Sequence, residues 1–340
     1  MQNRYFPTTT WQNVAPATMN MDTEKLLELE TTVKSEYSNI NGILVGRNGY
    51  IVFEKYFHGF EPADTYHITS VTKSLLSALI GIAINKGYIE NIDQLVLDFF
   101  PEYIPENDNP QKHEVTLRHL LTMTAPYSFE DWHEPFEKLC ASEDWIKYTL
   151  DMLGENGSLG VFKYSSAGAH LLSAILTRST GKTAREFANE HLFAPTGMKT
   201  IPAYEIKTFD FENLFGKKLQ GWAYDPSGNS TGGWGLKLTL QDMARFGLLY
   251  LNNGTWNKNQ IIPEEWIKAS IALNSNKYGY LWWLFKEKEV FAYAAMGDGG
   301  NIICCIPEKN MVVAIASEFI MNPRDRWTLI KEHIIPTVKE

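Results

Sequence analysis

The stretch HITSVTKSLLSALIGIAI, residues 67–84, constrains the fold more than any other part of the chain. It is apolar on nearly every side, which predicts a helix enclosed by other elements rather than one on the surface. Yet one stripe of that helix, at positions i, i+3, i+4, i+7 and i+11, carries small or polar residues: Ser70, Lys73, Ser74, Ser77 and Gly81. Because burying a lysine is costly, a lysine one turn after a serine in such a helix points to chemistry.

Length and charge narrow the function classes. A chain of 340 residues that is 44% hydrophobic can bury a large core, which we expect to be divided between about two domains. A net charge of −9 argues against nucleic acid or an anionic membrane as the main partner. No secretory signal or membrane-spanning run is visible, and only three cysteines occur. We therefore expect a cytoplasmic protein with reduced thiols.

Strand signals occur near both ends of the chain and are absent from the middle. Asn48-Gly49 lies between two β-rich runs and predicts a hairpin. Further short strand patterns return only after residue 280, and the adjacent Cys304 and Cys305 should point to opposite faces of one strand. The predicted fold is α+β, with one antiparallel sheet flanked by N- and C-terminal helices. Residues 1–87 and 221–340 form this sheet domain, and residues 88–220 form an inserted all-helical domain.

Two other serine motifs lack the context that catalysis requires. Gly228-Asn229-Ser230-Thr231-Gly232 matches G-x-S-x-G, but no strand precedes it and no helix follows directly. Ser179-Thr180-Gly181-Lys182 lies at a break between helices and is typical of a turn. Histidines and cysteines show no metal-ligand spacing, and we expect neither a metal nor a cofactor.

The Ser70-Val71-Thr72-Lys73 motif is different, because it opens a buried helix. At a helix N-terminus the serine N–H is free to stabilise an oxyanion, and the helix dipole adds partial positive charge. A lysine three residues later reaches the same face and can contact the serine hydroxyl. The alternative is structural: Ser70 caps the helix and Lys73 extends its side chain to water.

With these residues in view, the sequence resembles the serine β-lactamase and penicillin-binding-protein superfamily. It is most similar to the class C-like branch that includes family VIII esterases, 6-aminohexanoate-dimer hydrolases and D-aminopeptidases. The resemblance runs from about residue 41 to 317 and rests on five segments in order: SVTKSLLSALIGIAINKGYI, TLRHLLTMTA, FKYSSAGAHLLSAIL, GGWGLKLTLQDMARFGLLYLNNGTWNKNQIIPEEW and YAAMGDGGN. It implies the same α+β fold, with the active site between the sheet and the helical insertion.

The resemblance also implies roles for individual residues. Ser70 takes the position of the nucleophile, Lys73 that of its partner, and Tyr164 that of the tyrosine in the family's Y-x-N motif. Asp298-Gly299-Gly300 falls where relatives carry K-T-G or H-x-G. The backbone of Asn301 would then supply the second oxyanion N–H.

The chain departs from the family pattern at two positions. Ser166 replaces the asparagine that normally contacts the lysine and the substrate amide, and it could instead cap a helix. Asp298 replaces a lysine or histidine, which disfavours β-lactams and peptides that end in D-Ala-D-Ala. A carboxylate about 4 Å from an oxyanion costs roughly 4 kcal/mol at an effective dielectric constant of about 20. Asp298 must therefore turn outward, pair with a cation or meet a cationic substrate group.

The expected function is hydrolysis of a small-molecule ester or amide through an acyl-enzyme on Ser70. Lys73 and Tyr164 should titrate as a coupled pair, so the base is not assigned to either alone. Two alternatives remain: a β-lactamase or DD-peptidase, and a non-catalytic binding module. Aromatic residues are expected to form the pocket walls, although each could equally pack in the core: Trp222, Tyr224, Trp234, Trp282 and Tyr127.

Overall fold

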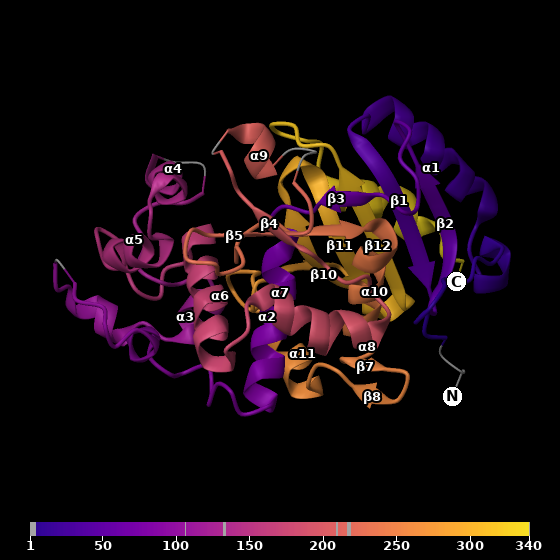
Figure 1. Ribbon diagram of the computed structural model, residues 1–340. Helices are drawn as coiled ribbons and strands as arrows, with labels where there is room; N and C mark the ends of the chain where they lie inside the picture. Colours follow the sequence, from indigo (N-terminus) through magenta and orange to yellow (C-terminus); the bar gives the residue numbers. More distant parts are fainter. Residues whose placement is uncertain (1–4, 106, 132–133, 209, 216–218, 340) are drawn as a thin grey trace.

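A computed structural model describes residues 5–105, 107–131, 134–208, 210–215 and 219–339. Its main element is a six-stranded antiparallel sheet in the order β2-β1-β12-β11-β10-β9 (Figure 1). The strands are β1 (Ile40–Arg47), β2 (Tyr50–Tyr56), β9 (Trp283–Glu287), β10 (Val290–Gly297), β11 (Asn301–Ile306) and β12 (Met311–Ser317). Since β1 pairs with β12, the two ends of the chain meet in the middle of the sheet. The predicted α+β class and antiparallel sheet are confirmed.

Each face of the sheet is covered by helices, because side chains alternate between two apolar clusters. Cys304 joins the cluster under α1 (Thr23–Glu36) and α12 (Arg326–Leu329), whereas Cys305 joins the cluster that contains α2 (Val71–Asn85) and α10 (Leu240–Leu251). The two cysteines therefore face opposite sides, as their adjacency predicted. The expected C-terminal helix begins at Arg326 and changes to a π-helical turn at Ile330–Ile334.

Helices fill most of the middle of the chain, and they lie on the α2 side of the sheet (Figure 1). They are α3 (Leu117–Leu121), α4 (Glu134–Ala141), α5 (Trp145–Met152), α6 (Ser166–Thr180), α7 (Ala184–Ala188), α8 (Ala194–Thr196), α9 (Phe211–Phe215) and, later in the chain, α11 (Glu264–Ser270). Most are short, whereas α6 has 15 residues. Asp144 caps the start of α5. None of the helices within the described residues is both long and apolar enough to cross a membrane.

Three two-stranded pairs complete the fold. β3 (Thr65–His67) pairs with β6 (Lys237–Thr239), and β4 (Ala203–Glu205) pairs with β5 (Trp222–Tyr224). β7 (Thr255–Trp256) pairs with β8 (Asn259–Gln260). The first pair positions the site, because β3 leads directly into α2.

Helix α2 is enclosed, as its apolar sequence predicted: every residue from Val71 to Ala83 is buried. The lower part of its small and polar stripe serves packing. The Ser74 hydroxyl donates to the Leu281 carbonyl oxygen at 2.5 Å. A β-carbon on Gly81 would lie 2.4 Å from the Trp266 ring, so a larger residue would displace α11. Only Ser70 and Lys73, at the start of the stripe, are left for chemistry.

Candidate active site

Ser70 follows a strand–turn–helix transition. β3 ends at His67, and Thr69 has a φ of 47°, a left-handed conformation that is unusual for a β-branched residue. The Thr69 hydroxyl donates to the Asp298 carbonyl oxygen at 3.1 Å, and the Thr69 carbonyl accepts from the Thr72 hydroxyl at 2.7 Å. Strain of this kind persists only where surrounding contacts fix it, and it concentrates at functional sites. It presents Ser70 at the N-terminus of α2.

Lys73 is buried beside that serine, with 1% of its surface exposed. Its ammonium donates three hydrogen bonds: to Ser70 Oγ at 2.8 Å, to Ser166 Oγ at 2.7 Å and to the Gly233 carbonyl oxygen at 2.8 Å. Within the described residues the Ser70 side chain makes no capping bond to α2. The structural alternative, in which Ser70 is a cap and Lys73 extends to water, is therefore excluded on both counts.

Ser166 lies at the first turn of α6, and an acidic partner that the sequence did not reveal stands behind it. Asp131 Oδ1 accepts from the Ser166 N–H at 2.6 Å, and Asp131 Oδ2 accepts a very short bond from the Ser166 hydroxyl. The same Oδ2 is 3.8 Å from Lys73 Nζ. The helix cap is Ser165, whose side chain accepts from the Gly168 N–H, so the expected capping role of Ser166 is wrong.

Tyr164 completes the cluster from the segment before α6. Its ring stacks on Trp283 with centroids 5.8 Å apart, and Lys73 Nζ lies 4.7 Å from the ring centre. Burial raises the pKa of Tyr164 well above its usual value, and the nearby Ser70 side chain only partly offsets this. Burial lowers the pKa of Lys73, against the opposing effect of the Asp131 and Asp298 carboxylates. Burial therefore disfavours the charged form of both groups.

The backbone that approaches Ser70 belongs to the end of β10. A β-carbon on Gly297 would lie 3.1 Å from the Ser70 nitrogen and 2.1 Å from Thr69 Oγ1, which leaves room only for glycine. Asn301, expected to supply the second oxyanion N–H, is instead paired with Gly297 across the β10–β11 ladder. Its side-chain amide donates to the Asp298 carbonyl oxygen at 2.9 Å. The backbone that lies against the Ser70 nitrogen is therefore that of Gly297.

The turn at Asp298–Gly300 joins β10 to β11 and consists of one carboxylate residue followed by two glycines. The Asp298 side chain is exposed and lines the cleft, so its carboxylate faces solvent at the rim. Gly300 also lines the cleft. A β-carbon on Gly300 would lie 2.7 Å from the Arg326 guanidinium, and one on Gly299 would lie 2.9 Å from the Glu318 carbonyl oxygen, so neighbouring groups leave room only for glycine at both positions.

The cleft at Ser70 has a volume of about 470 Å³. Tyr164 and Trp283 supply its aromatic surface, and four carboxylate residues contribute to its lining: Glu130, Asp131, Asp298 and Asp325. The aromatic residues expected at its walls, Trp222, Tyr224, Trp234, Trp282 and Tyr127, do not line it. Trp222, Trp234, Trp282 and Tyr127 are core residues. Trp282 stacks on Phe246 in the core, whereas Trp283, the first residue of β9, lines the cleft.

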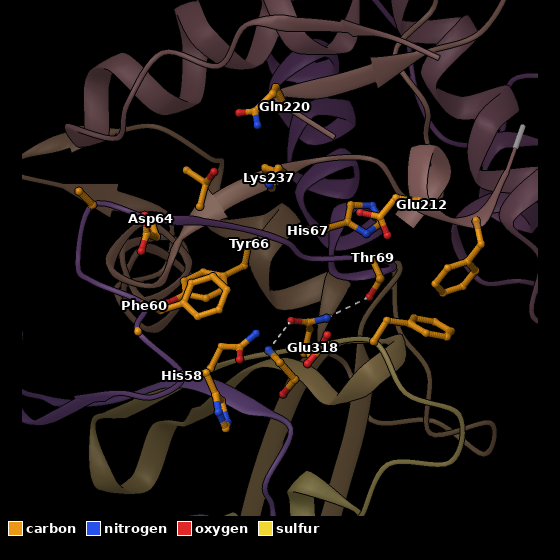
Figure 2. A pocket seen from close by; sticks show the side chains of 18 residues that line it. His58, Phe60, Asp64, Tyr66, His67, Thr69, Glu212, Gln220, Lys237 and Glu318 are labelled. Atoms are coloured by element: carbon orange, nitrogen blue, oxygen red, sulfur yellow. Dashed lines mark hydrogen bonds between the residues drawn. The ribbon is translucent and has the colours of Figure 1, made fainter. Parts of the chain in front are cut away.

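A second cavity has a volume of about 770 Å³ and shares Asn301 with the lining of the cleft. Figure 2 shows the side chains that line this second cavity. Tyr66, His67 and Lys237 from the β3–β6 pair line it, together with Glu318 after β12. Asn301 lines both cavities, and its amide lies 3.5 Å from Thr69 Oγ1. The contact between Asn301 and Thr69 therefore forms part of the wall between the second cavity and Ser70. Among the described residues, no group of three or more His, Cys, Asp or Glu side chains is placed to hold a metal ion.

Comparison with known proteins finds a family and solved structures with a similar fold. The sequence model of the β-lactamase family matches residues 37–326. The 6-aminohexanoate-dimer hydrolase of Paenarthrobacter ureafaciens is 23% identical over 278 residues, which cover 77% of this chain but only 63% of that enzyme. A solved structure from Bacillus anthracis, ascribed to a 6-aminohexanoate-dimer hydrolase, superposes with a TM-score of 0.75 at 19% identity and covers 98% of this chain and 88% of its own. EstCE1, a hydrolase with promiscuous acyltransferase activity, superposes with a TM-score of 0.66 at 14% identity, over 93% of this chain and 98% of its own.

Proposed function

Since this chain belongs to the β-lactamase family of hydrolases, we propose that it cleaves an ester or amide bond of a small molecule through an acyl-enzyme on Ser70. The observation that carries the proposal is the burial of Lys73 with one of its three donor positions aimed at Ser70 Oγ. A non-catalytic binding module has no physical need for a buried lysine held in this way. The comparisons support hydrolysis, and the substrate is inferred from the cleft.

In the proposed mechanism, neutral Lys73 accepts the Ser70 proton as Ser70 Oγ attacks the carbonyl carbon. The N–H groups of Ser70 and of Asp298 then stabilise the oxyanion, while the dipole of α2 adds partial positive charge. Tyr164, whose ring centre lies 4.7 Å from Lys73 Nζ, donates a proton to the leaving oxygen or nitrogen and regains one from the Lys73 ammonium. Water finally hydrolyses the acyl-enzyme and releases the acid.

The charges around the cleft favour a neutral or cationic substrate. Four carboxylate residues line the cleft; Asp131 is bonded to Ser166 and Asp325 caps α12. The two arginines of the cleft are also engaged. Arg324 pairs with Glu36, and Arg326 donates to the backbone carbonyl oxygens of Gly299, Gly300 and Arg324. A substrate carboxylate, such as that of a penicillin, would meet repulsion instead of a cation. We therefore expect hydrolysis of p-nitrophenyl butyrate but not of nitrocefin.

The test compares p-nitrophenyl butyrate hydrolysis by wild type, Ser70→Ala and Ser230→Ala. Ser230 belongs to the G-x-S-x-G motif but is 2% exposed, and its hydroxyl accepts from the Arg185 N–H at 3.1 Å. We expect Ser70→Ala to lose turnover and fluorophosphonate labelling, and Ser230→Ala to keep both. Equal activity of wild type and Ser70→Ala would refute the proposal, as would an inactive and unlabelled wild type. Nitrocefin turnover would refute the substrate assignment.

A further inference from the structure

Lys73 Nζ has three hydrogen-bond partners, and the role of Lys73 as a base depends on which of them it donates to. A neutral amine has two N–H donors and one lone pair, and it acts as a base towards Ser70 only if the lone pair points at that hydroxyl. The Gly233 carbonyl oxygen can only accept, so it fixes one N–H. The Ser166 hydroxyl could accept from Lys73 or donate to it, and a donated proton would occupy the lone pair.

Asp131 removes that ambiguity. Its Oδ2 accepts the hydrogen bond of the Ser166 hydroxyl, and its Oδ1 accepts from the Ser166 N–H at 2.6 Å. The carboxylate therefore binds both groups of the same residue. A carboxylate can only accept, which leaves Ser166 Oγ with lone pairs alone towards Lys73 Nζ, 2.7 Å away. Both N–H groups of a neutral lysine are then committed to Gly233 and Ser166. The remaining position, 2.8 Å from Ser70 Oγ, holds the lone pair.

We propose that Asp131 is a positioning residue that makes Ser166 an obligate hydrogen-bond acceptor and so directs the lone pair of Lys73 at Ser70. The pair Asp131–Ser166 supplies what a single amide oxygen could supply, an acceptor that cannot donate. This inference rests on the proposed function, since it concerns the acylation step at Ser70. Asp131 itself is not required to touch the substrate.

The test measures how kcat for p-nitrophenyl butyrate depends on pH in three variants. They are Asp131→Asn, Asp131→Ala and the double variant Asp131→Ala/Ser166→Asn. An asparagine at 131 can donate to Ser166 and reverse its hydroxyl, so kcat should fall on the order of 10- to 100-fold while KM changes little. Removal of the carboxylate also removes a charge that favours the Lys73 ammonium, so the acidic limb should move to lower pH. Asparagine at 166 brings its own amide oxygen into the space left by Asp131→Ala, so the double variant should recover most of the loss.

Two controls separate this role from a structural one. Glu130→Gln removes a neighbouring cleft carboxylate, and its acidic limb should move less than that of Asp131→Asn. Thermal melting establishes that each variant is folded, and Ser166→Ala replaces Asp131→Asn if the latter is not. The inference is overturned if folded Asp131→Asn keeps the wild-type kcat and the wild-type acidic limb of the pH profile. It is also overturned if Ser166→Asn does not restore activity to a folded Asp131→Ala variant. If Ser70→Ala is inactive, the proposed function stands even when either of these outcomes overturns the inference about Asp131.

Discussion

At the scale of single residues, the proposed proton transfer depends on two neighbours whose pKa values burial shifts in opposite directions. Burial favours the neutral form of both groups, and for Lys73 the neutral form is the base. For Tyr164 the neutral form is the acid, because its pKa lies well above the usual value. These directions are consistent with the proposed division of labour, in which Lys73 accepts from Ser70 and Tyr164 donates to the leaving group.

Tyr164→Phe tests that division. Phenylalanine keeps the ring that stacks on Trp283 but removes the hydroxyl that we propose protonates the leaving group. We expect kcat for an alkyl ester such as ethyl butyrate to fall roughly 10²- to 10⁴-fold, as for loss of a general acid, with little change in thermal stability. The fall for p-nitrophenyl butyrate should be smaller, because p-nitrophenolate leaves without a proton. Equal rates of wild type and this variant with the alkyl ester would contradict a role for the tyrosine proton.

The sequence predicted Ser70, Lys73 and Tyr164 as a group, because short-range spacing and motif resemblance indicate them. It did not indicate Asp131, which precedes Ser166 by 35 residues and lies in an irregular segment where no periodicity fixes the direction of a side chain. The same limit explains why the sequence indicated Trp282 as a wall of the cleft and did not indicate Trp283. A one-residue difference in strand phase decides which of two adjacent tryptophans faces the cleft.

At the scale of elements, the glycine-rich loop at 221–235 holds an acceptor for Lys73. Its Gly233 carbonyl binds the ammonium, and a β-carbon on Gly233 would lie 2.6 Å from the Ser166 β-carbon. Buried Asp225 anchors the loop: its carboxylate accepts from the Asn229 N–H at 2.8 Å and lies 2.9 Å from His170 Nε2. Because the Gly232 N–H donates to His170 Nδ1, the neutral ring carries its proton on Nε2 and donates it to Asp225.

This anchor predicts an acid-dependent loss of stability. Burial alone would raise the pKa of Asp225, but the hydrogen bonds from His170 and Asn229 outweigh it and leave the pKa below its ordinary value. A carboxyl with a lowered folded pKa contributes stability that is complete above the unfolded pKa of about 3.9 and is lost as pH falls through the folded value. Asp225→Asn should cost about 1.5–3 kcal/mol at pH 7, and less as pH falls below about 4. Urea unfolding from pH 7 to pH 3 measures this difference, and a constant value across the range would contradict it.

At the scale of the whole molecule, the chain ends build the sheet and also fix the active-site turn. Arg326 at the start of α12 is 2% exposed, and burial lowers its pKa to about 10. Its guanidinium donates to the Gly300 carbonyl at 3.2 Å, the Arg324 carbonyl at 2.9 Å and Asn39 Oδ1 at 2.7 Å. One side chain thus joins the residue before β1, the C-terminal helix and the turn that follows Gly297. Sequence patterns predicted the helices and strands but not this joint, because its partners are mostly backbone carbonyls that no motif marks.

Arg326→Lys tests whether that joint supports catalysis as well as folding. Lysine keeps the charge but lacks the planar set of five donors, so buried carbonyl oxygens lose their partners. We expect a loss of roughly 2–4 kcal/mol in unfolding free energy. We also expect about a tenfold fall in kcat, because the turn carries the peptide proposed as the second oxyanion donor.

Arg324→Lys is the matched control: Arg324 pairs with Glu36 at the surface, where such a pair contributes about 0–1 kcal/mol. If the two variants unfold at the same denaturant concentration and Arg326→Lys keeps wild-type kcat, the C-terminal helix covers the sheet without holding the site. If Arg326→Lys alone loses both stability and kcat, the oxyanion site depends on contacts between the two ends of the chain.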